Sequence, residues 1–162
     1  MMPAITLTLP YPVSSNRYWA TRIIKMKGAL KPTAMIYVTP EAKAFKEKVQ
    51  WLARQAGVRT PFQGRFNLLI ILHPHCPQDA HRRMKRDPCG WEDTVQCMDL
   101  DNAQKVTIDA LKGVVFEDDK RAWDIHSKRG TPVDGGKLVV TITPIAPAMA
   151  AQEQGDLLET LA

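Results

Sequence analysis

The amino-acid sequence predicts a mixed α+β (mixed α/β) fold, in which a small mixed β-sheet packs with two main helices. Segments with strand-like and helix-like apolar patterns follow one another in the order strand, helix, strand, helix, strand, strand. The chain has 162 residues, of which 44% are hydrophobic and 24% charged. This size and composition are typical of one folded domain. We therefore expect a single domain over residues 1–144, followed by a flexible acidic tail over residues 145–162.

The two helices have clear start and stop signals. Thr39 followed by Pro40 predicts a helix start, because threonine caps free amides and proline is preset for the first helical position. Apolar residues then recur at helical spacing as far as Gly57. A second helix is predicted over residues 102–112 and ends at Gly113.

The strands are predicted from two kinds of apolar pattern. Residues 5–9 alternate apolar residues with threonine, whereas residues 66–72 form a continuous apolar run typical of a central strand. Two later strands are expected over residues 123–127 and 138–143. Trp123 begins the first of these as part of an alternation with charged residues, which favours packing of its ring in the core.

Two long segments carry basic residues without an apolar period. Residues 14–32 hold five bases and are predicted as a basic loop with a short hairpin around Gly28. Residues 74–97 include four bases in the five positions 82–86 and are predicted as a second basic loop. Loops of this length commonly carry a function.

The charge distribution indicates a polyanion as the partner. The net charge is +5, yet residues 99–119 hold six acids and two bases, and residues 145–162 hold three acids and no base. The rest of the chain is therefore strongly basic, which suits nucleic acid because phosphate neutralisation supplies most non-specific affinity. The acidic segment would repel the same polyanion unless cations lie between them.

The sequence has no pattern typical of membrane insertion or secretion. No apolar run approaches the roughly 18 residues of a membrane-spanning helix, and the first residues lack a signal-peptide pattern. The three cysteines have irregular spacing, which argues against a disulfide framework. We expect a cytoplasmic protein without membrane contacts.

The acidic segment has the residue types of a metal site. Asp99 and Asp101 lie at positions i and i+2 before the second helix, so on an extended segment both carboxylates point to one side. Asp101 or Asn102 can cap the helix, and Lys105 lies one turn further on. The Asp118-Asp119 pair ends the segment after the helix, and a sheet can return it to the side of Asp99.

Converging carboxylates repel one another unless divalent cations neutralise them. Ligands of oxygen alone suit Mg²⁺ or Mn²⁺, and two such ions about 4 Å apart can clamp the attacking and leaving oxygens of a phosphoryl displacement. The plain alternative is that Asp-x-Asp caps a helix and that Asp101 and Lys105 form an exposed ion pair of little energy. The combination within a basic chain favours the metal site.

Two other groups of side chains were weighed. Zinc has candidate ligands in His73, His75, Cys76, His81, Cys89 and Cys97. No Cys-x-x-Cys or His-x-x-x-His pair occurs among them, which favours free thiols and imidazoles in a loop. Tyr18, Trp19, Trp91 and Trp123 are candidates for stacking on exposed bases, although for Trp123 the alternating pattern favours core packing.

Two segments resemble a known family. Residues 98–105, MDLDNAQK, and residues 108–119, IDALKGVVFEDD, closely resemble the RusA-type Holliday junction resolvases. The opening strand with the Pro10, Pro12 and Asn16 that follow it is similar to the start of that family, and so is the closing strand after the Gly135-Gly136 pair. The resemblance covers roughly residues 5–143.

The resemblance implies a small mixed α/β domain that forms an intertwined homodimer with two Mg²⁺-dependent sites. Such enzymes nick four-way DNA junctions symmetrically and leave 5′-phosphate and 3′-hydroxyl ends, and many are encoded by phages or prophages. The implied catalytic residues are Asp99, Asp101, Asp119 and Lys105. The three aspartates would bind the metal, with Asp118 as a possible helper and with Mn²⁺ as a substitute for Mg²⁺.

We therefore expect a resolvase that acts on branched DNA in the cytoplasm of a bacterial or phage-infected cell. DNA contacts are expected from Asn16, Arg17, Arg22, Lys25, Lys27, Arg82, Arg83, Lys85 and Arg86. No organic cofactor is expected. Two alternatives stay open: a non-catalytic DNA-binding module, and a metal nuclease acting on other branched or duplex DNA.

Overall fold

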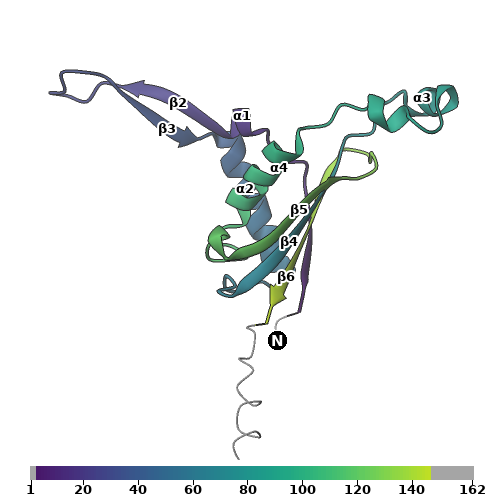
Figure 1. The fold of residues 1–162 in the computed structure, drawn as a ribbon. Coiled ribbons are helices and arrows are strands. Elements are labelled where there is room, and N and C mark those ends of the chain that lie inside the picture. Colours follow the sequence, from purple (N-terminus) through teal and green to yellow (C-terminus); the bar gives the residue numbers. More distant parts are fainter. Residues whose placement is uncertain (1–2, 147–162) are drawn as a thin grey trace, which may run out of the picture.

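The computed structural model describes residues 3–146, which form a four-stranded mixed sheet, helices packed against it and a separate two-stranded hairpin (Figure 1). The strands lie in the order β1-β6-β4-β5. Their bounds are Ile5–Leu9 for β1, Arg65–His73 for β4, Ala122–Arg129 for β5 and Lys137–Ile145 for β6. β4 pairs in parallel with β5, whereas β6 pairs antiparallel with both β4 and β1. The predicted fold class is confirmed.

The local sequence fixes both ends of α2 (Pro40–Gln55). The Thr39 hydroxyl accepts a hydrogen bond from the Ala42 amide at 3.3 Å, and Pro40 occupies the first helical turn. Gly57 has a φ of +91°, a left-handed conformation that glycine adopts without strain, just after the helix end. This predicted helix is confirmed.

The core lies between the sheet and the inner faces of α2 and α4 (Leu100–Leu111). Alternate residues of the central strands point into it: Phe66, Leu68, Ile70 and Leu72 from β4, and Leu138, Val140 and Ile142 from β6. The rings of Phe66 and Phe116 stack with their centroids 4.6 Å apart. Because β4 has partner strands on both sides, its predicted central position is confirmed.

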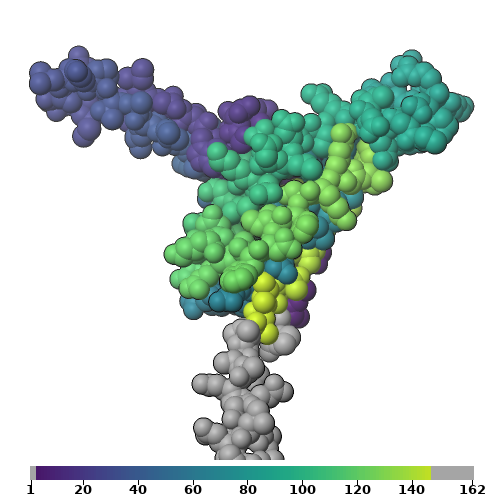
Figure 2. Space-filling model, viewed as in Figure 1, coloured from purple at the N-terminus to yellow at the C-terminus, as the bar shows by residue number. Residues whose placement is uncertain are grey.

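A hairpin projects from the body of the molecule (Figures 1 and 2). Its antiparallel strands are β2 (Trp19–Ile24) and β3 (Thr33–Val38), and the connection contains Gly28 with a φ of +93°. The hairpin predicted around Gly28 is confirmed, although much of the expected loop is strand. The short helix α1 (Ser15–Tyr18) precedes it, and the fully buried Tyr18 anchors its base in the core.

The second predicted loop, residues 74–97, is wrong in part, because it contains two short helices. These are α3 (Ala80–Arg86) and a 3₁₀ turn, η1 (Trp91–Thr94). Of its seven residues α3 buries only Ala80, so it has no apolar period that sequence reasoning could detect. Ion pairs hold it instead: Asp79 contacts Arg83 at 2.8 Å and Arg82 at 3.3 Å.

α4 begins two residues earlier than predicted, which corrects the expected geometry of the acids. Asp99 is its N-cap, with extended φ and ψ of −61° and 139°, and Asp101 lies in the first helical turn. The expectation of an extended segment with both carboxylates on one side is therefore wrong. The physical reason is Leu100, which packs against the core when the helix begins there.

The expected core position of Trp123 is also wrong, because its side chain is 65% exposed. The pairing of β5 with β4 shifts by one residue: Ala122 lies opposite Phe66, and Asp124 lies opposite Asn67. Trp123 is the extra residue of this bulge, and a bulge re-aims the side chain it carries.

Of the predicted tail over residues 145–162, Ile145 belongs to β6. Residues 147–162 lie outside the described residues. Among the described residues no helix combines the length and apolar character needed to cross a membrane.

Candidate active site

One face of α4 lines an open cavity of about 400 Å³. Asp101, Lys105 and Lys112 recur at helical spacing and therefore share this face. Asp119, from the turn after the helix, and Trp19, from the base of the hairpin, also line the cavity. The structure thus brings three predicted catalytic residues, Asp101, Lys105 and Asp119, to one cavity.

Lys105 lies between the acidic start of α4 and the hairpin. Its Nζ is 5.0 Å from the centroid of the Trp19 ring, within the range of a cation–π contact. The Trp19 ring packs in turn on the ring of the buried Tyr18, with centroids 4.4 Å apart. Trp19, predicted as a base-stacking candidate, therefore contacts Lys105, the lysine predicted to be catalytic, in this structure.

A polar network fixes the base of the hairpin to α4. The Tyr18 hydroxyl donates a hydrogen bond to Asp109 Oδ2, and Lys46 Nζ contacts the same oxygen at 3.1 Å. Burial of Tyr18 raises its pKa far above the ordinary value. The hydrogen bond to Asp109 and the negative charge of that residue add to this effect. Sequence reasoning missed Asp109. Its position four residues after Lys105, on the same helix face, was the available signal.

The acids after α4 are held by lysines. Lys112 Nζ lies 2.6 Å from Asp119 Oδ1 and 3.4 Å from Asp118 Oδ1, and Lys120 Nζ lies 3.0 Å from Asp118 Oδ2. The hydrogen bond from the Lys120 side chain holds the pKa of the Asp118 carboxyl well below its usual value. The hydrogen bond to Asp119 raises the pKa of Lys112. Ammonium groups therefore balance the negative charge of this turn.

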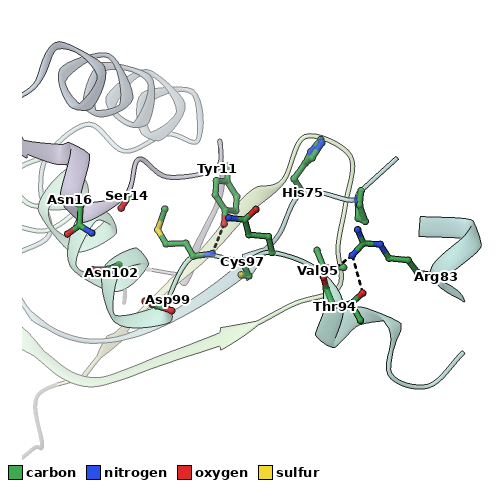
Figure 3. Close-up of a pocket in the computed structure, with 13 residues that line it drawn as sticks. Tyr11, Ser14, Asn16, His75, Arg83, Thr94, Val95, Cys97, Asp99 and Asn102 are labelled. Carbon is green, nitrogen blue, oxygen red and sulfur yellow. Dashed lines mark hydrogen bonds between the residues drawn. The ribbon is translucent and has the colours of Figure 1, made fainter. Parts of the chain in front are cut away.

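Asp99 lines a different and larger cavity, of about 760 Å³. Figure 3 shows it near Asn102 at the start of α4, with Asn16 from α1 on the same side of the cavity. The amide of Met98 donates a hydrogen bond to the Tyr11 hydroxyl at 3.0 Å, which fixes the segment before the helix. Asp99 and Asp101 therefore face two cavities around one helix start.

The predicted metal ligands do not form a cluster within residues 3–146 of one chain. No three His, Cys, Asp or Glu side chains in that range lie close enough to hold one metal ion. Asp101 and Lys112, which contacts Asp119, lie at opposite ends of α4, and that length of helix spans about 16 Å. The donors themselves fit a hard divalent cation, because Asp99, Asp101, Asp118 and Asp119 offer only oxygen.

The predicted DNA-binding residues lie mainly on two arms that diverge on either side of the start of α4 (Figures 1 and 2). The hairpin arm carries Arg22, Lys25 and Lys27, and the α3 arm carries Arg82, Arg83, Lys85 and Arg86. Most of these side chains are exposed.

Three of the predicted DNA contacts form ion pairs within the protein: the exposed Arg82 with Asp79, and two further arginines that join separate segments. Arg17 pairs with Glu41 at 2.9 Å. Arg83 pairs with Asp79 and also donates to the Thr94 carbonyl oxygen at 2.8 Å, which ties α3 to η1. These contacts give both arginines a structural role, whether or not they also reach DNA.

The cysteines and histidines of residues 73–97 form no metal cluster in the described part of the chain. Cys76, Cys89 and Cys97 are free thiols, and Nδ1 of His73 lies 2.9 Å from the Thr131 carbonyl oxygen.

Comparisons with known proteins give the family. The model of a family described as "Endodeoxyribonuclease RusA" matches residues 10–143. A crossover junction endodeoxyribonuclease of Enterobacteria phage HK97 is 29% identical over 85% of this chain and 92% of its own length. The RusA proteins of Escherichia coli strains E24377A and K12 are 27% and 28% identical, over 89% and 88% of this chain and 98% and 96% of their own lengths. The resemblance noted in the sequence is confirmed: the chain belongs to the RusA family of endodeoxyribonucleases.

Proposed function

We propose that this protein is a Mg²⁺-dependent endodeoxyribonuclease that resolves four-way DNA junctions by paired symmetric nicks, in recombination or repair. The observation that carries the proposal is the polar face of α4, where Asp101 and Lys105 lie at the base of two basic arms. The basic arms suit the phosphates of DNA arms, and the acidic helix face suits the metal-assisted attack on one phosphate. The names of the matched relatives, crossover junction endodeoxyribonucleases, support this substrate.

RusA-family nucleases are metal-dependent. The residues to hold the ion are Asp99, Asp101 and Asp119, with Asp118 as a helper, and their oxygen ligands suit Mg²⁺ or Mn²⁺. A bound divalent cation supplies an activated water and stabilises the charge that develops at phosphorus.

The chain's own residues position the DNA. Lys105, held by the Trp19 ring at 5.0 Å, is placed to neutralise a non-bridging oxygen of the scissile phosphate. Exposed lysine and arginine side chains of the hairpin arm and the α3 arm neutralise phosphates further away. They also steer the DNA towards the start of α4, where the two protein arms meet. The Tyr18–Asp109–Lys46 network keeps the hairpin arm fixed relative to α4.

A homodimer would complete the site. In one chain, Asp101 and Asp119 belong to opposite ends of the polar face of α4. If two copies meet through this face in antiparallel orientation, their two-fold axis brings Asp101 of each chain towards the partner's Asp119. The same symmetry gives two sites for the two nicks that a four-way junction requires.

Cleavage of a synthetic four-way junction tests the function. We expect nicks at symmetry-related positions of two opposing strands in Mg²⁺, none in EDTA, and slow cleavage of a duplex with the same arm sequences. Equal cleavage of duplex or flap DNA would instead indicate a related metal nuclease. Tight junction binding without cleavage, in Mg²⁺ and in Mn²⁺, would indicate the non-catalytic module.

A further inference from the structure

Trp123 is a large aromatic side chain that the fold turns to solvent. Its side chain is 65% exposed, and it lies in β5, an edge strand of the four-stranded sheet. The register shift opposite Phe66 and Asn67 makes Trp123 the extra residue of the bulge. Bulges at sheet edges commonly re-aim a side chain beside an active site. The exposure of the Trp123 ring is therefore a consequence of the strand pairing. Trp123 belongs to a paired strand and not to an unpaired loop.

A cation holds the ring in place. The guanidinium carbon of Arg65, the first residue of β4, lies 4.3 Å from the centroid of the Trp123 ring. At this distance the guanidinium covers one face of the indole. Since most of the residue is still exposed, the opposite face is open to solvent. The result is a flat, supported aromatic surface with a positive charge behind it.

The surface lies, along the chain, next to the end of the candidate active site that carries Asp119. The turn η2 (Asp119–Arg121) comes directly before β5, so Trp123 follows the predicted metal ligand Asp119 by four residues. Four residues of chain span at most about 14 Å. Lys120 and Arg121 in the same turn are exposed, and their positive charges suit a nearby phosphate backbone.

We propose that Trp123, supported by Arg65, is a stacking platform for a base whose face is exposed at the branch point of the DNA. The inference rests on the proposed function, because the branch point of a four-way junction interrupts the continuous stack and so exposes base faces. A base that leaves the helical stack at the branch point has an exposed π face, and an open tryptophan face accepts any of the four bases. A continuously stacked duplex exposes no such face along its length, so the platform favours branched DNA over duplex.

The chain offers a matched control in Trp51 on α2. Trp51 is 49% exposed and also lies against a cation, with Lys48 Nζ 4.2 Å from the ring centroid. The two sites share an exposed indole and a neighbouring positive charge, but α2 carries none of the predicted metal ligands. A difference between substitutions at the two sites therefore reports on position, not on the loss of an exposed tryptophan.

The test measures DNA affinity in EDTA, so that cleavage plays no part. We expect Trp123→Ala to weaken binding of a four-way junction about 10-fold, which corresponds to about 1.4 kcal/mol, and to leave binding of a matched duplex unchanged. Trp51→Ala should change neither affinity, and Trp123→Phe should retain most of the junction affinity. Equal thermal midpoints would show that the exposed substitutions leave the fold intact.

Tryptophan fluorescence gives a second readout in the same buffer. We expect junction DNA to quench the wild-type emission, the quenching to be reduced in Trp123→Phe, and the Trp51→Phe protein to quench like the wild type apart from its missing emission.

Unchanged junction affinity of Trp123→Ala, or an equal loss on duplex, would overturn the inference alone. So would dissociation of the variant into monomers, which would place Trp123 between two copies of the chain. Failure of the wild type to bind the junction would overturn the proposed function, and the inference with it.

Discussion

At the scale of single residues, the acids at the two ends of α4 differ in how their charge is balanced. Asp118 and Asp119 each contact a lysine within 3.0 Å. The ion pairs of the described residues do not include Asp101 or Asp99. A metal ion can therefore approach Asp101 directly, but it must compete with the ammonium of Lys112 for Asp119.

Replacement of Asp101 tests its role as a ligand. Asp101→Asn should lower cleavage of a four-way junction by a factor on the order of 100 or more, because metal assistance contributes several kcal/mol to the transition state. Junction affinity in EDTA should stay the same or rise, since the change removes a negative charge near DNA phosphates. Gel-shift and cleavage assays on one preparation separate the two effects. Retained cleavage with lost binding would contradict the assignment.

Replacement of Lys112 tests the competition for Asp119. Lys112→Met should raise the affinity for Mn²⁺ a few-fold, as measured by titration calorimetry without DNA, because Asp119 loses its internal counter-ion. Lys120→Met is the matched control, because Lys120 contacts Asp118 but forms no ion pair with Asp119 within the described residues. An equal gain in both variants would show a general charge effect and not a specific one.

The buried Tyr18 makes stability depend on alkaline pH. The pKa of Tyr18 is raised in the folded protein, whereas a tyrosine of the unfolded chain has a pKa of about 10. Above that pH the folded state binds more protons than the unfolded state, so the free energy of unfolding falls as the pH rises. Thermal midpoints between pH 8 and pH 11 should fall more steeply for the wild type than for Tyr18→Phe. At neutral pH the variant should be less stable by about 1 kcal/mol, for the lost hydrogen bond.

The residue positions that the sequence predicted correctly are those fixed by local spacing. Lys105 follows Asp101 by one helical turn, so their common position was readable from the chain alone. Trp123 was misplaced because its bulge depends on pairing with β4, more than fifty residues earlier in the sequence. The position of Asp99 on another cavity follows from the start of α4 at Leu100, a residue that packs against the core.

At the scale of elements, long segments with many buried side chains were predictable and short ones were not. α2 and β4 have strong apolar patterns and clear ends. α3 depends on ion pairs at Asp79 and on the bond from Arg83 to Thr94, which no periodicity reveals. The basic α3 arm is thus held by two of the arginines that the sequence assigned to DNA, Arg82 and Arg83.

The α3 arm allows DNA contact and structural support to be separated. Lys85→Ala combined with Arg86→Ala should weaken DNA binding and reduce its salt dependence by up to about 0.9 log units for each lost phosphate contact. Arg83→Ala should mainly lower the thermal midpoint, because it removes contacts to Asp79 and Thr94. Binding measured at four salt concentrations gives the slopes. An unchanged slope in the double variant would show that this end of the arm does not contact phosphate.

At the scale of the whole molecule, the proposed homodimer would complete a surface of which one chain supplies two arms and one acidic helix face. The arms diverge above the start of α4 (Figure 2), while the acids are divided between both ends of that helix. The sequence did not predict this division of the acids, since it depends on how the chain after α4 returns along the helix. A second copy supplies the missing acid only if the site is shared between chains.

Mixing two inactive variants tests whether the site is shared. Asp101→Asn and Asp119→Asn proteins should each be inactive as homodimers, and sedimentation should give about twice the chain mass of 18.2 kDa. In a shared arrangement, their heterodimer has one site with both substitutions and one site with both natural aspartates. Refolding the two variants together should therefore restore nicking of one strand of a four-way junction. If each site belonged to one chain, every site in the mixture would carry a substitution and no nicking would return. A mixture of wild-type and Asp101→Asn chains is the control, because its heterodimers nick one strand in either arrangement.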